Sequence, residues 1–241
     1  MAPMMEVQDR SRFKDGMKKL LTIDPKKTVV LTVDMQYNYL QMDAGGDPVL
    51  PDEAARVLKG AKELLDFARQ QSIPVVHVYT TRRELELEIN PNPMAYGKVG
   101  REVKLWQTPH TAQGELPDRP EGSHRSQVPV ELVAPSDLHV TTKKTMDGYL
   151  GSDLDWILTK ALRPETVVLT GINTDTCVYS TTFSTANRGY QPVVISDCVA
   201  SMRGKDSHLM ALELMSRSIA WVLTVAEFKA KVRAGVPVGV A

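Results

Sequence analysis

Six short apolar runs, each followed by a segment with a helical pattern, constrain what this chain can fold into. The runs are near-continuous in Val, Leu, Ile and Thr, as in TVVLTV (28–33), and such runs are typical of strands that a parallel sheet buries on both faces. Strands alternating with helices predict an open parallel sheet with right-handed crossovers and helices on both faces. We therefore predict an α/β fold, a single-domain three-layer α/β/α sandwich with a six-stranded parallel sheet. The predicted strands are Thr28–Val33, Ile73–Tyr79, Leu138–Thr142, Thr166–Thr170, Gln191–Ser196 and Ser218–Thr224.

The clearest helix opens at Pro51 and Asp52 and presents apolar residues at helical spacing to the sheet. That apolar face consists of Ala54, Val57, Leu58, Ala61, Leu64, Leu65 and Ala68. Further helices are predicted over Ser152–Ala161, from near Asp175, over Lys205–Met215 and over Val225–Val232.

Composition narrows the classes of partner and compartment. The 241 residues are 42% hydrophobic and 24% charged, close to an average globular protein, and the formal net charge is +0. Nothing in that balance favours nucleic acid or an anionic membrane as a partner. The two cysteines, Cys177 and Cys198, indicate no disulfide framework, and a reducing cytoplasm is the expected location. We find no apolar run long enough to span a bilayer and no signal-peptide core.

Two segments depart from the strand–helix alternation. Residues 1–25 are polar and mixed in charge, which predicts an N-terminal arm lying over the surface or over a partner subunit of a homo-oligomer, a dimer or tetramer. The domain then covers residues 26–241, with a long insert at about 80–136 that is interpreted either as a lid or as a solvated excursion or subunit contact. Its candidate ligand-facing side chains are Arg82, Arg83, Tyr96, Trp106, His110, His124 and Arg125.

The stretch TVVLTGINTDTCVYSTTFSTANRG (166–189) reads as a buried strand, a tight turn at Gly171 and a helix beginning near Asp175. Cys177 then lies in the first helical turn, where unpaired backbone N–H groups and the helix dipole favour a thiolate. We expect this thiol to ionise more easily and to act as a nucleophile. The alternative is a buried cysteine that serves as a small apolar side chain.

Three polar side chains are predicted to meet at one edge of the sheet. Asp34 ends the first strand, Lys143 and Lys144 follow the third, and Cys177 follows the fourth. Because ligands bind at the carboxyl ends of parallel strands, Asp34 is well placed for function, although an Asp there can also cap a turn. A carboxylate that takes the thiol proton and an ammonium that supports the anion suit nucleophilic catalysis. His77 lies inside a strand, where a structural role is expected.

Three segments in this order resemble motifs of the isochorismatase-like cysteine hydrolases, which include nicotinamidases, carbamoylsarcosine amidases, biuret hydrolases and ureidoacrylate amidohydrolases. VLTVDMQYNYL places Asp34, Gln36 and Tyr39 where the family commonly has D-x-Q-x-x-F. TKKTMDGYLGSDL is similar to K-x-x-x-S-x-F and then T-x-L, and LTGINTDTCVYSTTFSTANRGY to G-x-x-T-x-x-C-V-x-S-T and then G-Y. The resemblance runs from about Thr28 to Phe228 and implies the isochorismatase-like hydrolase fold.

The resemblance implies a catalytic set of Asp34, Lys143 and Cys177. The family's lysine precedes the aromatic residue of its motif by six positions, so Tyr149 implies Lys143 rather than Lys144. The family also has a non-proline cis peptide before the nucleophile loop, which corresponds to the Ile172–Asn173 bond. The backbone N–H groups of Asn173 and Cys177 would then form an oxyanion hole.

Departures from the family motifs narrow the predicted chemistry. Nicotinamidases carry an Asp-x-His metal motif after the second strand, where this chain reads YTTRREL, so we predict no metal and no cofactor. Isochorismatases that cleave a vinyl ether lack the cysteine, so Cys177 argues against that reaction. Asp147 and Gly148 replace the usual Ser and small residue, and Tyr149 replaces Phe, which adds a hydroxyl near the pocket. The residues expected to bind substrate are Gln36, Tyr39, Arg82, Trp106 and Tyr149.

The predicted function is a cysteine-dependent amidohydrolase that cleaves a C–N bond of a small amide, carbamoyl or ureido compound through a thioester. Two alternatives stay open. One is an isochorismatase-like esterase or vinyl-ether hydrolase that uses the same pocket. The other is a non-catalytic member that binds a metabolite or a protein.

Overall fold

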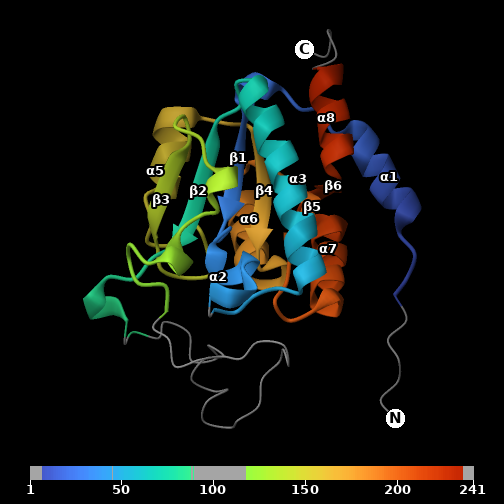
Figure 1. Ribbon diagram of the computed structural model, residues 1–241. Helices are drawn as coiled ribbons and strands as arrows, with labels where there is room; N and C mark the ends of the chain where they lie inside the picture. The colour runs from blue at the N-terminus through green and yellow to red at the C-terminus, as the bar shows by residue number, and fades with distance from the viewer. Residues whose placement is uncertain (1–6, 45, 88, 90–117, 236–241) are drawn as a thin grey trace, which may run out of the picture.

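The computed structural model describes residues 7–44, 46–87, 89 and 118–235. Its centre is a six-stranded sheet in the order β3-β2-β1-β4-β5-β6, and every neighbouring pair is parallel. The predicted α/β fold with a six-stranded parallel sheet is therefore confirmed (Figure 1). The strands are β1 (Thr28–Val33), β2 (Val75–Thr80), β3 (Leu138–Lys143), β4 (Thr166–Ile172), β5 (Gln191–Ala200) and β6 (Trp221–Leu223).

Helices cover both faces of the sheet. The helices of the described part are α1 (Ser11–Leu20), α2 (Tyr37–Leu40), α3 (Pro51–Gln70), α5 (Leu154–Trp156), α6 (Tyr179–Asn187), α7 (Lys205–Ser218) and α8 (Val225–Ala234). Helices α3 and α8 share one apolar cluster with the sheet, whereas α5, α6 and α7 are associated with a second cluster on the opposite face. Two π-helical turns, η6 (Ile157–Leu162) and η7 (Thr174–Val178), extend α5 and precede α6.

Burial of the central strands on both faces explains why their sequences are apolar without alternation. All six residues of β1 are buried, and Val30 packs in the cluster beneath α3 while Val29 and Leu31 pack in the cluster of the opposite face. A strand buried on both sides has no solvent face for polar residues. The pairing of β1 with β4 runs without interruption from Thr28 opposite Thr166 to Val33 opposite Gly171.

Several predicted boundaries are wrong, among them the sixth strand, which is shorter than predicted because Ser218 ends α7, and two of the differences have clear local causes. β5 continues to Ala200 because the register with β4 shifts between Leu169 and Gly171, so Asp197 and Cys198 lie inside the strand and not at its end. The Asp197 side chain accepts a hydrogen bond from the backbone N–H of Val225, at the start of α8, at 2.8 Å. The helix predicted over Ser152–Ala161 is a short α5 continued by the wider turn of η6.

Segments outside the alternation acquire local structure of their own. Residues 11–20 form α1, which lies beside α8 (Figure 1). The end of the insert returns to the sheet through a parallel bridge between Arg82 and Pro120, followed by the short helices η4 (His124–Ser126) and η5 (Val130–Leu132). Tyr96, Trp106 and His110 lie outside the described residues. No helix within the described ranges has the length and apolar character needed to cross a membrane.

Candidate active site

Asp34 directly follows β1 and is fully buried. Its backbone has a φ of 48°, a left-handed conformation that Asp tolerates better than most residues. One carboxylate oxygen, Oδ1, accepts a hydrogen bond from the backbone N–H of Thr80 at 3.0 Å. The other, Oδ2, lies 2.6 Å from Lys143 Nζ. The turn after β1 therefore holds a carboxylate inside the protein with a partner on each oxygen.

Lys143 reaches Asp34 across β2, because β3 and β1 are not neighbours in the sheet. Its side chain is 1% exposed, and Nζ lies 3.3 Å from Thr80 Oγ1 and 3.7 Å from Cys177 Sγ. Lys144 points elsewhere, with Nζ 2.5 Å from the Thr81 carbonyl oxygen and 2.9 Å from Glu86 Oε2. Successive strand residues face opposite sides, so one of the two lysines enters the site.

Cys177 lies in the π-helical turn η7 and is 7% exposed. Burial raises the pKa of its thiol to about 11, and the neighbouring Asp34 carboxylate, which hydrogen-bonds to the thiol, adds to this rise against the lowering effect of Lys143. The expectation that this thiol ionises more easily is therefore wrong for the site without substrate. The loss of hydration outweighs the stabilisation offered by a helix start and one ammonium group.

The loop that carries Cys177 is tied down on several sides. The peptide bond between Ile172 and Asn173 is cis, at the place that the family resemblance implies. The Asn173 carbonyl accepts hydrogen bonds from the N–H groups of Thr176 and Val178 at 3.2 and 3.0 Å. Asn173 Oδ1 accepts from the Met202 N–H at 2.8 Å, which ties the loop to the segment before α7. The oxyanion-hole role of the Asn173 and Cys177 N–H groups stays a prediction.

A second anchor of the same loop comes from α7. Thr174 Oγ1 lies 2.9 Å from Nδ1 of His208, and both side chains are buried. Burial lowers the pKa of His208, which favours its neutral form. A neutral imidazole bonded to Thr174 therefore helps to hold the loop that carries Cys177 in place.

Comparison with known proteins identifies the family to which this chain belongs. Residues 28–227 match the isochorismatase domain family. This chain belongs to the isochorismatase family of hydrolases. It is 27% identical over 218 residues to the ureidoacrylate amidohydrolase RutB of Caulobacter vibrioides strain ATCC 19089, which covers 87% of this chain and 92% of the relative. It is 26% identical over 217 residues to YwoC of Bacillus subtilis, an uncharacterized isochorismatase family protein, covering 90% of this chain and 100% of YwoC.

Solved structures of other proteins share the fold. A cysteine hydrolase from Pseudomonas syringae pv. phaseolicola 1448A superposes with a TM-score of 0.69 at 21% identity, covering 89% of this chain and 96% of that chain. N-carbamoylsarcosine amidase from Thermoplasma acidophilum gives a TM-score of 0.59 at 23% identity, covering 83% and 96%.

The residues expected to bind substrate mostly have other partners. The Gln36 amide nitrogen donates to the carbonyls of Thr80 and Ser126 at 2.9 and 2.8 Å, so this side chain joins the β2 exit to the insert. The Tyr149 hydroxyl lies 2.9 Å from Thr185 Oγ1 in the core, and the Arg188 guanidinium covers its ring at 4.1 Å. The Tyr149 hydroxyl thus has a partner on α6, and its predicted role in substrate binding stays a prediction.

Tyr39 and Arg82 lie at the edge of the site and contact the returning insert. The Tyr39 hydroxyl accepts a hydrogen bond from Arg119 Nη1 at 2.7 Å. Arg82 contacts Asp118 at 3.3 Å through Nε and donates to the Lys144 carbonyl at 3.2 Å through Nη2. Trp106 lies outside the described residues.

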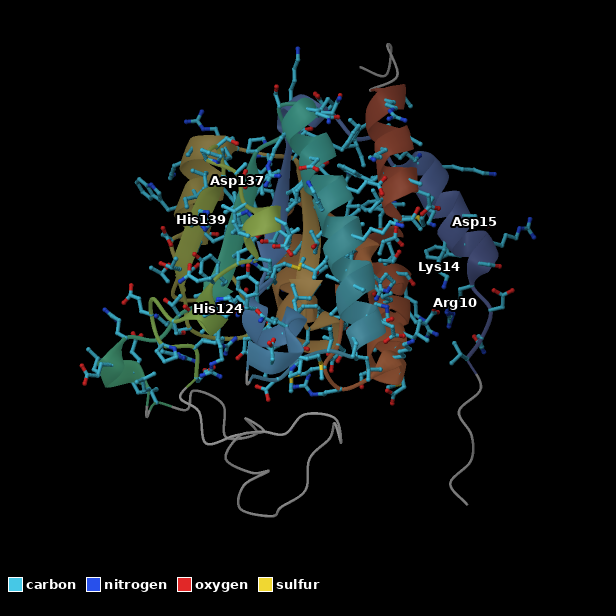
Figure 2. The ribbon with its side chains drawn as sticks, viewed as in Figure 1. Arg10, Lys14, Asp15, His124, Asp137 and His139 are labelled. Atoms are coloured by element: carbon cyan, nitrogen blue, oxygen red, sulfur yellow. The ribbon has the colours of Figure 1, made fainter. Side chains whose placement is uncertain are left out.

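The described histidines of this isochorismatase-family chain make different polar contacts, although the rings of His77 and His139 lie 5.0 Å apart. His77 is buried between Thr32 Oγ1 at 2.7 Å and Asp137 Oδ2 at 3.1 Å, and burial lowers its pKa to about 4, as suits the structural role expected of it. His124 Nε2 lies 2.7 Å from Gln41 Oε1, well away from His139 (Figure 2). Within the described ranges, no group of three or more His, Cys, Asp or Glu residues could hold a metal ion.

Two residues near the site, Thr80 and Arg119, were not predicted from the sequence. Thr80 contacts both Asp34 and Lys143, and its place directly after an apolar run was a usable signal. Arg119 lies in an irregular stretch, where no periodicity or strand end indicates which side chains turn inward.

Proposed function

We propose that this protein is a cysteine-dependent amidohydrolase that cleaves a C–N bond of a small amide, carbamoyl or ureido compound through a thioester. One observation carries the proposal: the Lys143 ammonium lies 2.6 Å from Asp34 Oδ2 and 3.7 Å from Cys177 Sγ in a buried site. A carboxylate and a thiol that both contact one ammonium group match the needs of acyl transfer, which uses a base, a cation and a nucleophile. The relative named ureidoacrylate amidohydrolase supports the amide class.

Asp34 is the base of this scheme, since the Cys177 thiol, with a pKa raised to about 11, is neutral at pH 7. The thiol proton passes to Asp34 as Sγ forms a bond to the substrate carbonyl carbon, and the π electrons move onto the carbonyl oxygen. The oxyanion collapses, the C–N bond breaks, and the departing ammonia or amine takes the proton from Asp34. The acyl or carbamoyl group remains on Cys177 as a thioester.

Water then hydrolyses the thioester, with Asp34 again accepting and returning the proton. Asp34 removes a proton from water, the hydroxyl oxygen attacks the thioester carbon, and the C–S bond breaks. Asp34 returns the proton to the sulfur, and the acid product leaves. Lys143 stays charged throughout and stabilises the anionic sulfur and carboxylate, an effect that is stronger in a buried site than in water.

Ammonia release from a panel of small amides and ureido compounds tests the proposal. We expect turnover by the wild-type protein and its loss in Cys177→Ala. Cys198→Ala is the matched control, because Cys198 is equally a buried cysteine but lies inside β5, and it should keep full turnover.

Two outcomes would replace the proposal. Hydrolysis of esters or vinyl ethers without ammonia release from any amide would indicate the esterase or vinyl-ether reaction. Binding of panel compounds without any turnover would indicate a non-catalytic member of the family.

A further inference from the structure

The returning end of the insert carries Arg119 to the rim of the active site. The backbone N–H of Arg82 donates to the Arg119 carbonyl at 3.0 Å, and the Glu121 N–H donates to the Arg82 carbonyl at 2.8 Å. Arg82 is two residues beyond Thr80, whose N–H holds the Asp34 carboxylate. Arg119 is thereby fixed beside the end of β2.

The Arg119 side chain turns inward from that position. Its side chain is 12% exposed, and Nη1 donates to the hydroxyl of Tyr39, in the helix that follows Asp34, at 2.7 Å. Nε and Nη2 donate to the two Asp118 oxygens at 2.7 and 3.1 Å. Among the described residues, these contacts use three of the five guanidinium N–H groups and leave two donors. The guanidinium also interacts electrostatically with Asp34 and with Cys177.

Among the described residues, the charges around Arg119 leave an excess of positive charge. Asp118 is shared between two guanidinium groups, since Arg82 Nε also contacts it at 3.3 Å. Asp34 is already paired with Lys143. Asp47 interacts with Arg119 over a longer range, and burial raises the pKa of its carboxyl, which reduces the negative charge that it contributes. A largely buried guanidinium with donors to spare and one carboxylate for two arginines is suited to bind an anion.

We propose that Arg119 binds the carboxylate of the substrate, so that the substrate is an amide, carbamoyl or ureido acid and not a neutral amide. This inference rests on the proposed function, in which Cys177 attacks the other end of the same molecule. A guanidinium placed at a fixed point from the nucleophile would orient the scissile carbonyl and reject neutral analogues.

A structural role for Arg119 predicts a different behaviour. If Arg119 only joins the insert to Tyr39, its removal weakens binding of neutral and anionic compounds alike. The ratio of the two affinities therefore separates the two roles.

Binding to the Cys177→Ala protein measures that ratio without turnover. The probes are two pairs of similar size, 3-ureidopropionate with N-butylurea and succinamate with pentanamide, and the readout is the Kd from titration calorimetry. We expect at least one anionic probe to bind about tenfold or more tighter than its neutral partner. Adding Arg119→Gln should weaken the anionic probe by about 10- to 100-fold and the neutral one by no more than about threefold.

Arg83→Gln is the matched control, because Arg83 carries the same charge near the same insert but is 62% exposed and paired with Glu86. It should leave both affinities unchanged. Arg119→Lys, which keeps the charge without the bidentate geometry, is expected to bind the anionic probe with intermediate affinity, and it replaces Arg119→Gln in the comparison if the latter unfolds.

Equal affinities within both probe pairs, no binding of either anionic probe, or an anion preference unchanged in the Arg119 variants would overturn the inference. Ammonia release by the unmodified protein is a separate measurement. Its absence would refute the amidohydrolase proposal, whereas turnover of neutral and anionic amides at equal rates would refute only the role of Arg119.

Discussion

Cys177 combines two properties that oppose each other at the scale of a single residue. Its burial keeps the thiol neutral, with a pKa raised to about 11. In the proposed mechanism, the Lys143 ammonium stabilises the thiolate and the Asp34 carboxylate takes up its proton at the moment of attack. Proton transfer to Asp34 therefore accompanies C–S bond formation in the proposed mechanism. A site of this kind is protected from oxidants and alkylating agents until substrate arrives, because those reagents react with the thiolate.

Alkylation by iodoacetamide should report this state. Below its pKa the thiolate fraction of Cys177 rises about tenfold per pH unit, so its labelling rate should climb steeply from pH 7 to pH 9. Cys198 is fully buried and its thiol pKa is also raised by burial, so it should label more slowly at every pH. Peptide mapping over time gives both rates. Equal labelling of the two cysteines, or a Cys177 rate independent of pH in this range, would contradict the account.

The two adjacent lysines give a sharp test of position. Lys143→Ala should lower kcat by about 10²-fold or more, because a cation beside a developing anion in a dry site is lost. Lys144→Ala should change kcat by no more than about threefold, since its ammonium serves Thr81 and Glu86 outside the catalytic set. Steady-state ammonia release measures both variants, and the opposite ranking would exclude Lys143 from the catalytic set.

Stability is the control for that comparison. Lys143→Ala leaves the buried Asp34 carboxylate without its cation, which typically costs about 3–5 kcal/mol. The double variant Asp34→Asn, Lys143→Met removes both charges and should recover much of the stability without recovering activity. A double variant with restored turnover would show that the loss in Lys143→Ala comes from unfolding.

Residue-level prediction succeeded in placing the side chains that the sheet itself positions. Asp34, Lys143 and Cys177 end or follow strands, and parallel strands bring such residues to one edge. It did not foresee the hydrogen bonds of Gln36 and Tyr149, since their partners Ser126 and Thr185 lie 90 and 36 residues away in the chain. Residue types indicate that a side chain can donate a hydrogen bond, but long-range packing decides to which acceptor.

At the scale of elements, the close approach of β4 to β1 depends on Gly171. Its backbone has a φ of 127°, and a Cβ atom there would lie 1.9 Å from the Val33 carbonyl oxygen. The strand before the Cys177 loop, β4, thus contacts the strand before Asp34, β1, through backbone atoms at Gly171 and Val33.

Gly171→Ala should therefore destabilise the protein by more than about 4 kcal/mol, because neither strand can move without disturbing the core. Gly189→Ala is a matched control: that glycine also has a positive φ, of 80°, but an added Cβ meets no atom within 4 Å, so a loss of about 1 kcal/mol is expected. Urea unfolding gives both free energies. Equal losses would show that backbone conformation, not contact with Val33, is what requires glycine at 171.

The boundaries of strands and helices were predictable where the residue types change from apolar to polar. They were not predictable where a register shift or a wider helical turn sets the boundary. The β1 limits, Thr28–Val33, agree with the apolar run. The extension of β5 through Asp197 depends on a register shift against β4, which leaves no mark in the sequence of either strand. The π-helical turn at Cys177 is likewise set by the loop contacts of Asn173 and not by helix propensity.

At the scale of the whole molecule, α1 is attached to the β6 edge mainly by polar contacts. It contains no buried residue, and Lys14 and Lys18 pair with Glu213 and Glu227 at 2.6 and 2.7 Å. The Trp221 indole donates to the Met17 carbonyl at 2.9 Å. A cavity of about 440 Å³ remains between α1 and the α7–β6 region. Lys14 lies on the side of the molecule opposite His124 (Figure 2).

Deletion of residues 1–20 should therefore leave kcat unchanged and lower Tm by no more than about 5 °C, because half-exposed ion pairs each contribute about 0–1 kcal/mol. Thermal melting by circular dichroism and ammonia release check the two parts. A large loss of kcat would contradict the separation of α1 from the catalytic edge.

The overall architecture followed from the alternation of apolar runs and helices, because few arrangements bury both faces of a parallel sheet. The return of the insert did not follow from it. Its backbone bonds to Arg82 and its Arg119 side chain depend on contacts between segments far apart in sequence, in a stretch where charge and proline obscure any periodicity. The family fold was thus predictable, whereas the contacts of Arg119, on which the proposed substrate preference depends, were not.

The central claim is that Cys177 forms a thioester with the substrate carbonyl, and acid-quenched intact-mass and peptide mass spectrometry during turnover tests it most directly. The account predicts that the peptide containing Cys177 gains the mass of the acyl or carbamoyl group, that the adduct disappears when substrate is exhausted, and that Cys177→Ala neither forms it nor releases ammonia. Ammonia release at an undiminished rate by Cys177→Ala would contradict the account.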